Sequence, residues 1–398
     1  MSYLEEKPIA VLGGGATGRG HAACAAIVGK EVRLYEHPDF FEGLGCIRET
    51  RQIELSGLQQ SLYGFKRKGI ATLTMVTDDM ENAVKGAGLI VVSLPAVGFK
   101  PFFERLIPYL EDGQVIHFTT ANFGSMILRK MMREAACHKQ VIIGEWASQP
   151  YGIRIQSSGG QQLPELRINY WAITLRGAAF PMADQEAFFE SKKYLPSLDS
   201  VVDPIEADTV LDACFSNVNP ILHCPGTILG VGAMENWGLI YGEDKYTFSI
   251  YSHAYCPSIS KVQLALYKEE CALAKALGVG IQHYDNETFF SRSTILGAEH
   301  MGPKYKIPFE EQYQSAWTTG PFSIYNRYIT EDIPVGCHLF HLMGKKYGIE
   351  TPIIDSMIHL ANVMTESNYF ETGFTLEDIG LENLSPEQIQ KYLREGKF

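Results

Sequence analysis

The chain has 398 residues, of which 45% are hydrophobic and 20% charged, and its formal net charge is −12. This length exceeds what one hydrophobic core usually supports, so two domains are expected. The acidic balance, without a long block of Lys and Arg, argues against nucleic acid or an anionic membrane surface as a partner. No apolar run approaches the roughly 18–20 residues that a membrane helix needs.

The termini and cysteines indicate a cytoplasmic protein. The first residues, MSYLEEKPIAVLGGG, carry acidic side chains where a secretory signal would be basic. The eight cysteines are scattered and form no CxxC pair, which is typical of reduced thiols that serve as small apolar side chains. No set of His, Cys and carboxylate residues has the spacing of a metal site, so no catalytic metal is expected.

A glycine-rich motif follows the first apolar run, at residues 9–12. It reads Gly13-Gly14-Gly15-Ala16-Thr17-Gly18 and leads into a small-residue helical pattern that ends at Gly29. In a strand, turn and helix of this kind, Gly13 permits the turn, Gly15 admits a pyrophosphate, and Gly18 lets the helix pack on the strand. The backbone N–H groups at the helix start, including those of Ala16 and Thr17, would face the phosphates. The motif predicts a dinucleotide-binding site.

The second predicted strand, EVRLYE, ends at Glu36, which lies 36 − 13 = 23 residues after the first glycine. A carboxylate at this position accepts hydrogen bonds from the ribose hydroxyls of NAD and repels the 2′-phosphate of NADP. NAD is therefore the expected cofactor, with NADP possible.

Strands and helices then alternate as far as about residue 184. Continuous Val/Ile runs at 87–96, 114–120 and 140–155 indicate strands covered on both faces, hence a doubly wound, mostly parallel α/β Rossmann sheet. Ligands of such sheets bind at the carboxyl ends of the strands. This places Pro95 near the cofactor and Asn122 near the substrate. We expect a Rossmann domain over 1–184 and an all-α substrate domain over 185–398.

The helical half contains a histidine in an apolar segment, His223 in NPILHCPGTILGVG. On this segment alone, a buried histidine that only packs in the core is the simpler interpretation. The other histidines of this half lie in contexts typical of surface or packing residues: His253, His283, His300, His338, His341 and His359.

Several segments together resemble the octopine (opine) dehydrogenase family over nearly the whole chain. They are GGGATG, SLPA, GEWASQPYGIR, NVNPILHCPGTIL, NRYITEDIPVG and the tail from TGFTLEDIG onward. The resemblance implies that His223 and Asp332 form an acid/base pair and that Arg327 helps to hold a substrate carboxylate. It also implies NAD(P)-dependent condensation of an amino acid with a 2-oxo acid such as pyruvate, through hydride transfer to an imine, by a monomer or homodimer.

The chemistry of such a reaction favours the same residue types. A proton donor with a pKa near neutrality is needed, which suits histidine, and a carboxylate would orient it. Two substrate carboxylates need cationic partners, for which Arg327 is the first candidate and Arg154 the second.

Two other functions fit parts of the sequence. A ketopantoate-reductase-like or 3-hydroxyacid dehydrogenase would use a helical-domain lysine, and Lys261 and Lys275 are available. A catalytically silent NAD-binding sensor is the more distant alternative. If NADH oxidation requires an amine as well as an oxo acid, the ketopantoate-reductase-like or 3-hydroxyacid dehydrogenase is excluded. Any turnover would exclude the silent sensor.

Overall fold

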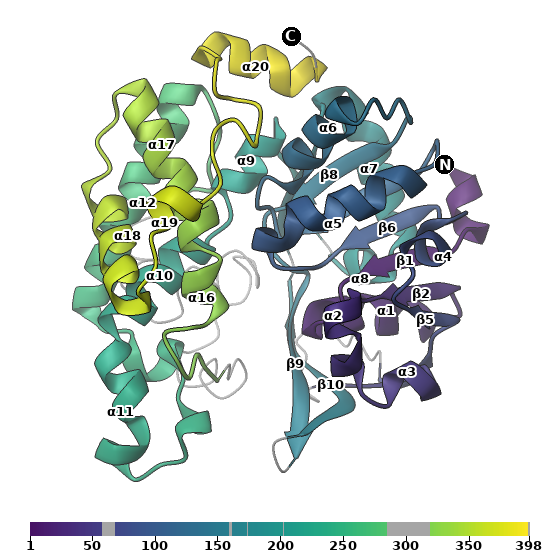
Figure 1. Ribbon diagram of the computed structural model, residues 1–398, viewed down its shortest axis with the longest axis horizontal. Coiled ribbons are helices and arrows are strands. Elements are labelled where there is room, and N and C mark those ends of the chain that lie inside the picture. The colour runs from purple at the N-terminus through teal and green to yellow at the C-terminus, as the bar shows by residue number, and fades with distance from the viewer. Residues whose placement is uncertain (58–67, 159–160, 173, 202, 285–318, 397–398) are drawn as a thin grey trace.

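The computed structural model describes residues 1–57, 68–158, 161–172, 174–201, 203–284 and 319–396. An α/β region formed by the first half of the chain lies beside a helical region formed by the second half (Figure 1). This arrangement confirms the predicted Rossmann domain followed by a helical domain. His300, predicted to be a surface or packing residue, lies outside the described residues.

The main sheet has eight strands. In spatial order they are β12 (Asp203–Glu206), β11 (Thr174–Ala179), β8 (Ile142–Trp146), β7 (Val115–Thr119), β6 (Leu89–Val92), β1 (Ile9–Leu12), β2 (Val32–Tyr35) and β5 (Met75–Thr77). All neighbouring strands are parallel except β11 and β8, which are antiparallel. Every residue of β1 and β6 is buried, because helices cover both faces of the sheet.

Alternate residues of the strands point to opposite faces of the sheet and pack in two separate hydrophobic cores. On one face, Ala10 and Leu12 join a cluster with α4 (Met80–Val84), α5 (Phe99–Leu106) and α6 (Gly124–Glu134). On the other face, Ile9 and Val11 join a cluster with α1 (Ala16–Ala26), α3 (Ile47–Thr50), α7 (Gln185–Ser191) and α8 (Pro196–Asp199). The short helix α2 (Pro38–Phe41) follows β2.

The sequence did not reveal a second, four-stranded sheet. Its order is β4 (Gly69–Thr72), β3 (Gln52–Gly57), β10 (Gln161–Trp171) and β9 (Tyr151–Ser158). The run 140–155, predicted as one strand, divides into β8 in the main sheet and β9 in the second sheet. The β9–β10 ribbon lies along the side of the α/β region that faces the helical region (Figure 1).

The boundary between the two domains lies later than the sequence suggested. We expected the helical domain from residue 185, but β12 still pairs with β11 in the main sheet. The apolar helix α7 also packs on this sheet through Phe188. The helical region therefore begins after Glu206. Helix α7 gave a misleading signal because a helix that covers a sheet has the same sequence pattern as one in a helical bundle.

Within the described residues, the helical region contains α9 (Val210–Phe215), α10 (Asn219–Leu229), α11 (Val231–Tyr241), α12 (Pro257–Leu277), α16 (Arg327–Thr330), α17 (His338–Tyr347), α18 (Pro352–Thr365), α19 (Tyr369–Thr372) and α20 (Pro386–Glu395). Two single-turn π-helices, Ile250–Ala254 and Ile333–Cys337, interrupt this pattern. Such turns are rare and occur frequently at functional sites.

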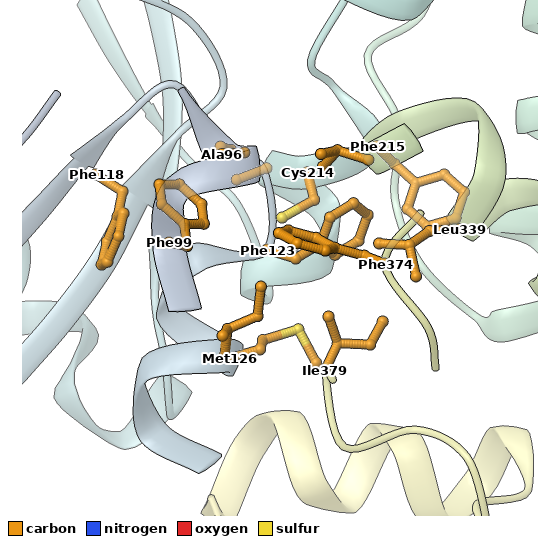
Figure 2. Packing of buried hydrophobic residues seen from close by; sticks show 14 of the residues in the cluster. Ala96, Phe99, Phe118, Phe123, Met126, Cys214, Phe215, Leu339, Phe374 and Ile379 are labelled. Atoms are coloured by element: carbon orange, nitrogen blue, oxygen red, sulfur yellow. The ribbon is translucent and has the colours of Figure 1, made fainter. Parts of the chain in front are cut away.

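Apolar packing joins the two regions. Figure 2 shows Phe123 and Met126 from the α/β region among Phe215, Leu339 and Phe374 from the helical region. The Phe123 and Phe340 rings make an edge contact with centroids 6.4 Å apart, and Phe215 packs on Phe340 at 4.8 Å. Each buried aromatic side chain contributes about 1.5–3 kcal/mol. This shared core holds the carboxyl ends of the strands opposite α10 and α16.

Candidate active site

The glycine loop between β1 and α1 has the geometry that a dinucleotide requires. Gly13 has φ +111, and a Cβ on it would lie 2.3 Å from the Ser93 carbonyl oxygen. A Cβ on Gly18 would lie 1.8 Å from the Gly13 carbonyl oxygen, so α1 can pack on the loop only with glycine there. Gly15, the N-cap of α1, has open space where its Cβ would be. The first N–H groups of α1, at Ala16 and Thr17, therefore begin beside space that can hold a pyrophosphate.

Glu36 lies directly after β2, as predicted, and is partly exposed. One carboxylate oxygen accepts a hydrogen bond from the Gly14 N–H (2.8 Å) and the other accepts one from the His37 N–H (2.7 Å). The carboxylate is thereby fixed against the glycine loop, where the ribose of a bound dinucleotide would lie.

The loops after β6 and β7 are also held in place. Pro95 caps a single 3₁₀ turn over Ala96–Gly98. Glu145 on β8 is fully buried and accepts hydrogen bonds from the Asn122 N–H (2.9 Å) and the Ser125 N–H (2.8 Å). Burial raises the pKa of Glu145, and the hydrogen bonds from Ser125 and Asn122 oppose this shift. Glu145 thus orders the loop that starts α6.

The structure brings His223 and Asp332 together across 109 residues of sequence. His223 Nδ1 lies 2.6 Å from Asp332 Oδ2, and the side chains are only 7% and 1% exposed. His223 is on α10, whereas Asp332 is the residue before the π-turn Ile333–Cys337. A carboxylate can only accept, so the imidazole donates from Nδ1 and leaves Nε2 as the atom that exchanges protons.

Two tyrosines complete the surroundings of the imidazole. The Tyr251 hydroxyl lies 3.0 Å from His223 Nε2 and 3.3 Å from the Tyr328 hydroxyl. The Tyr328 ring stacks on His223, with centroids 3.6 Å apart and planes 16° from parallel. The ring orientation is therefore set by Asp332 at one nitrogen and by stacking on its face.

Electrostatics make His223 a neutral group that can be protonated during a reaction. Burial lowers the pKa of His223, the Asp332 carboxylate raises it, and Arg327 and Arg154 lower it further. Arg154 is the second arginine that the sequence analysis named for a substrate carboxylate. Burial raises the pKa of Tyr251, and the charge of Arg154 opposes this shift, so Arg154 on β9 also acts on this residue of the helical region.

Glu331 connects the two regions, a role that sequence reasoning missed. Its Oε1 accepts hydrogen bonds from the Ala96 N–H (2.9 Å) and from Asn122 Nδ2 (3.3 Å). Its Oε2 accepts one from Arg327 Nε at 3.1 Å. Asn122 also accepts a hydrogen bond from Asn217 Nδ2 (2.9 Å), so both ends of its amide contact protein groups. Asn122, predicted to bind substrate, lies in the bridge between the two regions.

Arg327 remains available to a ligand despite this ion pair. Its side chain is 48% exposed, whereas that of Glu331 is 5% exposed. The Glu331 carboxylate, the largest influence, raises the pKa of Arg327. Burial raises the pKa of Glu331, and Arg327 opposes that shift. The i, i+4 spacing of Arg327 and Glu331 was a usable sequence signal for this pair, whereas nothing in the sequence indicated Tyr251.

The residues named for other functions lie elsewhere. Lys261 and Lys275 are exposed on α12. Within the described ranges, no group of three or more His, Cys, Asp or Glu side chains is placed to hold a metal ion. Among these same residues, no helix is both long and apolar enough to span a membrane.

The glycine loop and the acidic strand end of the α/β region, together with the buried His–Asp pair of the helical region, are typical of a nicotinamide-dependent dehydrogenase. A family model described as "NAD/NADP octopine/nopaline dehydrogenase, alpha-helical domain" matches residues 206–365. The chain is 25% identical over 393 residues to the opine dehydrogenase of Arthrobacter sp. (strain 1C), covering 97% of this chain and 99% of that protein. The helical region of this chain thus matches the model of the opine dehydrogenase family, and nearly the whole chain is similar to an opine dehydrogenase.

A further relative is similar to the chain in sequence, and two solved structures share its fold. Vitopine synthase of Allorhizobium ampelinum is 24% identical over 338 residues, which is 81% of this chain and 86% of that protein. A structure of octopine dehydrogenase with NADH and pyruvate superposes with a TM-score of 0.67 at 17% identity, covering 98% of both chains. A ketopantoate reductase from Ralstonia eutropha shares the fold at a TM-score of 0.55 and 16% identity, covering 90% of this chain and 98% of that one.

Proposed function

We propose that this protein is an opine dehydrogenase, which joins the amine of an amino acid to the carbonyl carbon of a 2-oxo acid and reduces the resulting imine. The overall reaction consumes one NAD(P)H and one proton and releases NAD(P)+ and water. The observation that carries the proposal is the buried His223–Asp332 pair of the helical region, which the charge of Arg154 on β9 influences.

The residues of the α/β region fit a nicotinamide dinucleotide. The open space at Gly15 and the close approach at Gly18 suit a pyrophosphate at the start of α1, and Glu36 suits a ribose with free hydroxyls. When bound, the cofactor supplies the hydride that reduces the imine carbon.

His223 handles the protons in this proposal. Its neutral imidazole takes a proton from the attacking ammonium group at Nε2, and the imidazolium then gives this proton to the carbinolamine oxygen that leaves as water. Asp332 stabilises the imidazolium and holds its tautomer. The Tyr251 hydroxyl occupies Nε2 until a substrate takes its place.

The two arginines hold substrate carboxylates. Arg327, fixed at Nε by Glu331, presents its remaining N–H groups to one carboxylate, and Arg154 faces the other. Asn122 acts indirectly in this scheme, because its amide positions Glu331. The exposed positions of Lys261 and Lys275 disfavour a lysine-dependent ketopantoate-reductase-like reaction.

The test is whether NADH oxidation requires both an amine and a 2-oxo acid. Each amino acid is paired with pyruvate, 2-oxoglutarate or glyoxylate, and absorbance at the nicotinamide band is followed. Turnover should need both substrates, and the product mass should equal the sum of the two substrates minus one oxygen atom. Oxidation of NADH with an oxo acid alone would instead identify a hydroxyacid dehydrogenase.

We also propose that the enzyme works in the cytoplasm, as a monomer or homodimer. All eight cysteines are free thiols, in agreement with a reducing compartment. Sedimentation velocity of the purified protein would distinguish the two oligomeric states.

A further inference from the structure

Two arginines lie side by side on the ribbon that faces the helical region. Arg154 on β9 and Arg167 on β10 are direct cross-strand partners in the antiparallel register. Direct partners project from the same face of a sheet. The neighbouring pair, Ile153 and Ile168, projects from the opposite face, which packs against α1: a Cβ on Gly20 of that helix would lie 2.7 Å from Ile153 Cδ1.

Neither guanidinium is neutralised by a carboxylate within the described part of the chain. Among the described residues, the side chain of Arg154 donates a hydrogen bond to the Ile153 carbonyl oxygen alone, at 3.0 Å, and Arg167 is exposed. Glu165, two residues before Arg167, instead accepts a hydrogen bond from the Ser56 hydroxyl at 3.0 Å. Like charges directly opposite each other destabilise a sheet, so an anionic ligand would relieve a cost that no carboxylate among the described residues compensates.

The arginine face is the one directed at the reaction site. Arg154 acts electrostatically on both His223 and Tyr251, which belong to the helical region. Figure 1 shows β9 as the strand of this ribbon beside the helical region. Arg167 lies directly opposite Arg154 on β10 and projects from the same face of the ribbon. It therefore borders the space between the ribbon and the helical region, one strand further from that region than Arg154.

The number of cations exceeds the need of a minimal substrate pair. An amino acid and a 2-oxo acid bring two α-carboxylates, which Arg327 and Arg154 can hold. Resting on the function proposed above, we propose that Arg167 forms a subsite for a third carboxylate, an acidic side chain on one of the two substrates, while Arg154 beside it holds an α-carboxylate. A guanidinium suits this group because it can form charge-assisted, bidentate hydrogen bonds with a carboxylate.

Isosteric substrate pairs test the subsite and identify which substrate carries the acidic group. Glutamate and glutamine are compared with pyruvate as oxo acid, and 2-oxoglutarate and 2-oxopentanoate are compared with alanine as amine. In one of the two comparisons, the acidic member should have a kcat/KM about tenfold higher or more, the effect of one added charge-assisted hydrogen bond.

Variants then assign this preference to Arg167. Arg167→Gln should reduce the acidic-to-neutral ratio roughly fivefold or more, and Arg167→Lys should retain most of it because the charge remains. Arg394→Gln, on α20 at the opposite end of the molecule (Figure 1), is the charge-matched control and should keep the wild-type ratio. Arg167 is exposed, so these variants should fold.

The outcomes separate the two proposals. If neutral pairs are turned over and neither acidic substrate is preferred by twofold, or if Arg167→Gln leaves the ratio unchanged, the subsite is refuted and the opine dehydrogenase function stands. If no pair of amino acid and oxo acid oxidises NADH, the proposed function fails and the subsite fails with it.

Discussion

Replacement of His223 gives the most direct test of the proposed chemistry. A positioned general acid/base contributes about 10²–10⁴-fold to rate, or about 2.7–5.4 kcal/mol of transition-state stabilisation at 1.36 kcal/mol per tenfold. We expect His223→Gln to lower kcat by this factor. Glutamine can still donate a hydrogen bond to Asp332, whereas His223→Ala would leave that buried carboxylate without the partner it has at 2.6 Å.

Asp332→Asn should reproduce part of this loss. A hydrogen bond to a charged group contributes about 1.5–3 kcal/mol, which predicts a decrease in kcat of roughly 10- to 150-fold. Asp332 is the main influence that raises the pKa of His223, so its removal lowers that pKa further. The imidazolium then forms only at lower pH, and the pH profile of kcat should shift to lower pH. The double variant should be far less than multiplicatively impaired, because the two residues act as one unit.

The assay is NADH oxidation under saturating amine and oxo acid, with NADH affinity measured separately by fluorescence titration. NADH affinity should stay within about twofold, since the other domain binds the cofactor. A matched control is His341→Gln, which removes another His–Asp pair, with His341 Nδ1 at 2.7 Å from Asp355 Oδ1 on α17 and α18. A folded His223→Gln enzyme with near-normal kcat would show that His223 only packs in the core.

Three further predictions concern other parts of the molecule. Glu36 should make NADH preferred over NADPH by about tenfold or more in kcat/KM, and equal use of the two cofactors would refute its assignment. Glu331→Gln weakens the hydrogen bonds that position Arg327 and the Ala96 loop. The KM for substrate should therefore rise about tenfold with a smaller change in kcat, and an unchanged KM would exclude this positioning role. Burial lowers the pKa of His21 and of His117 to about 3. Below the histidine pKa of about 6.5 in the unfolded chain, the unfolded state therefore binds more protons than the folded state. The free energy of unfolding, measured with urea, should be unaffected by these histidines above that pH and should fall by about 2 kcal/mol per histidine at pH 5.

The sequence determined the local features of this protein. The glycine loop, the strand that ends at Glu36 and the two-domain plan follow from short-range patterns, because turn geometry, burial and helix starts depend on neighbouring residues. The pairing of His223 with Asp332 was inferred through family resemblance, since no local pattern links positions 109 residues apart.

Tertiary structure alone decided the features that depend on contacts between distant segments. The second sheet arises because the run 140–155 breaks between β8 and β9, and the boundary moves beyond Glu206 because β12 pairs with β11. The same applies to the Glu331 bridge, to Tyr251 beside His223 and to the pairing of Arg154 with Arg167. Strand register and domain packing set these contacts, and both are fixed by the burial of the whole chain rather than by any one segment.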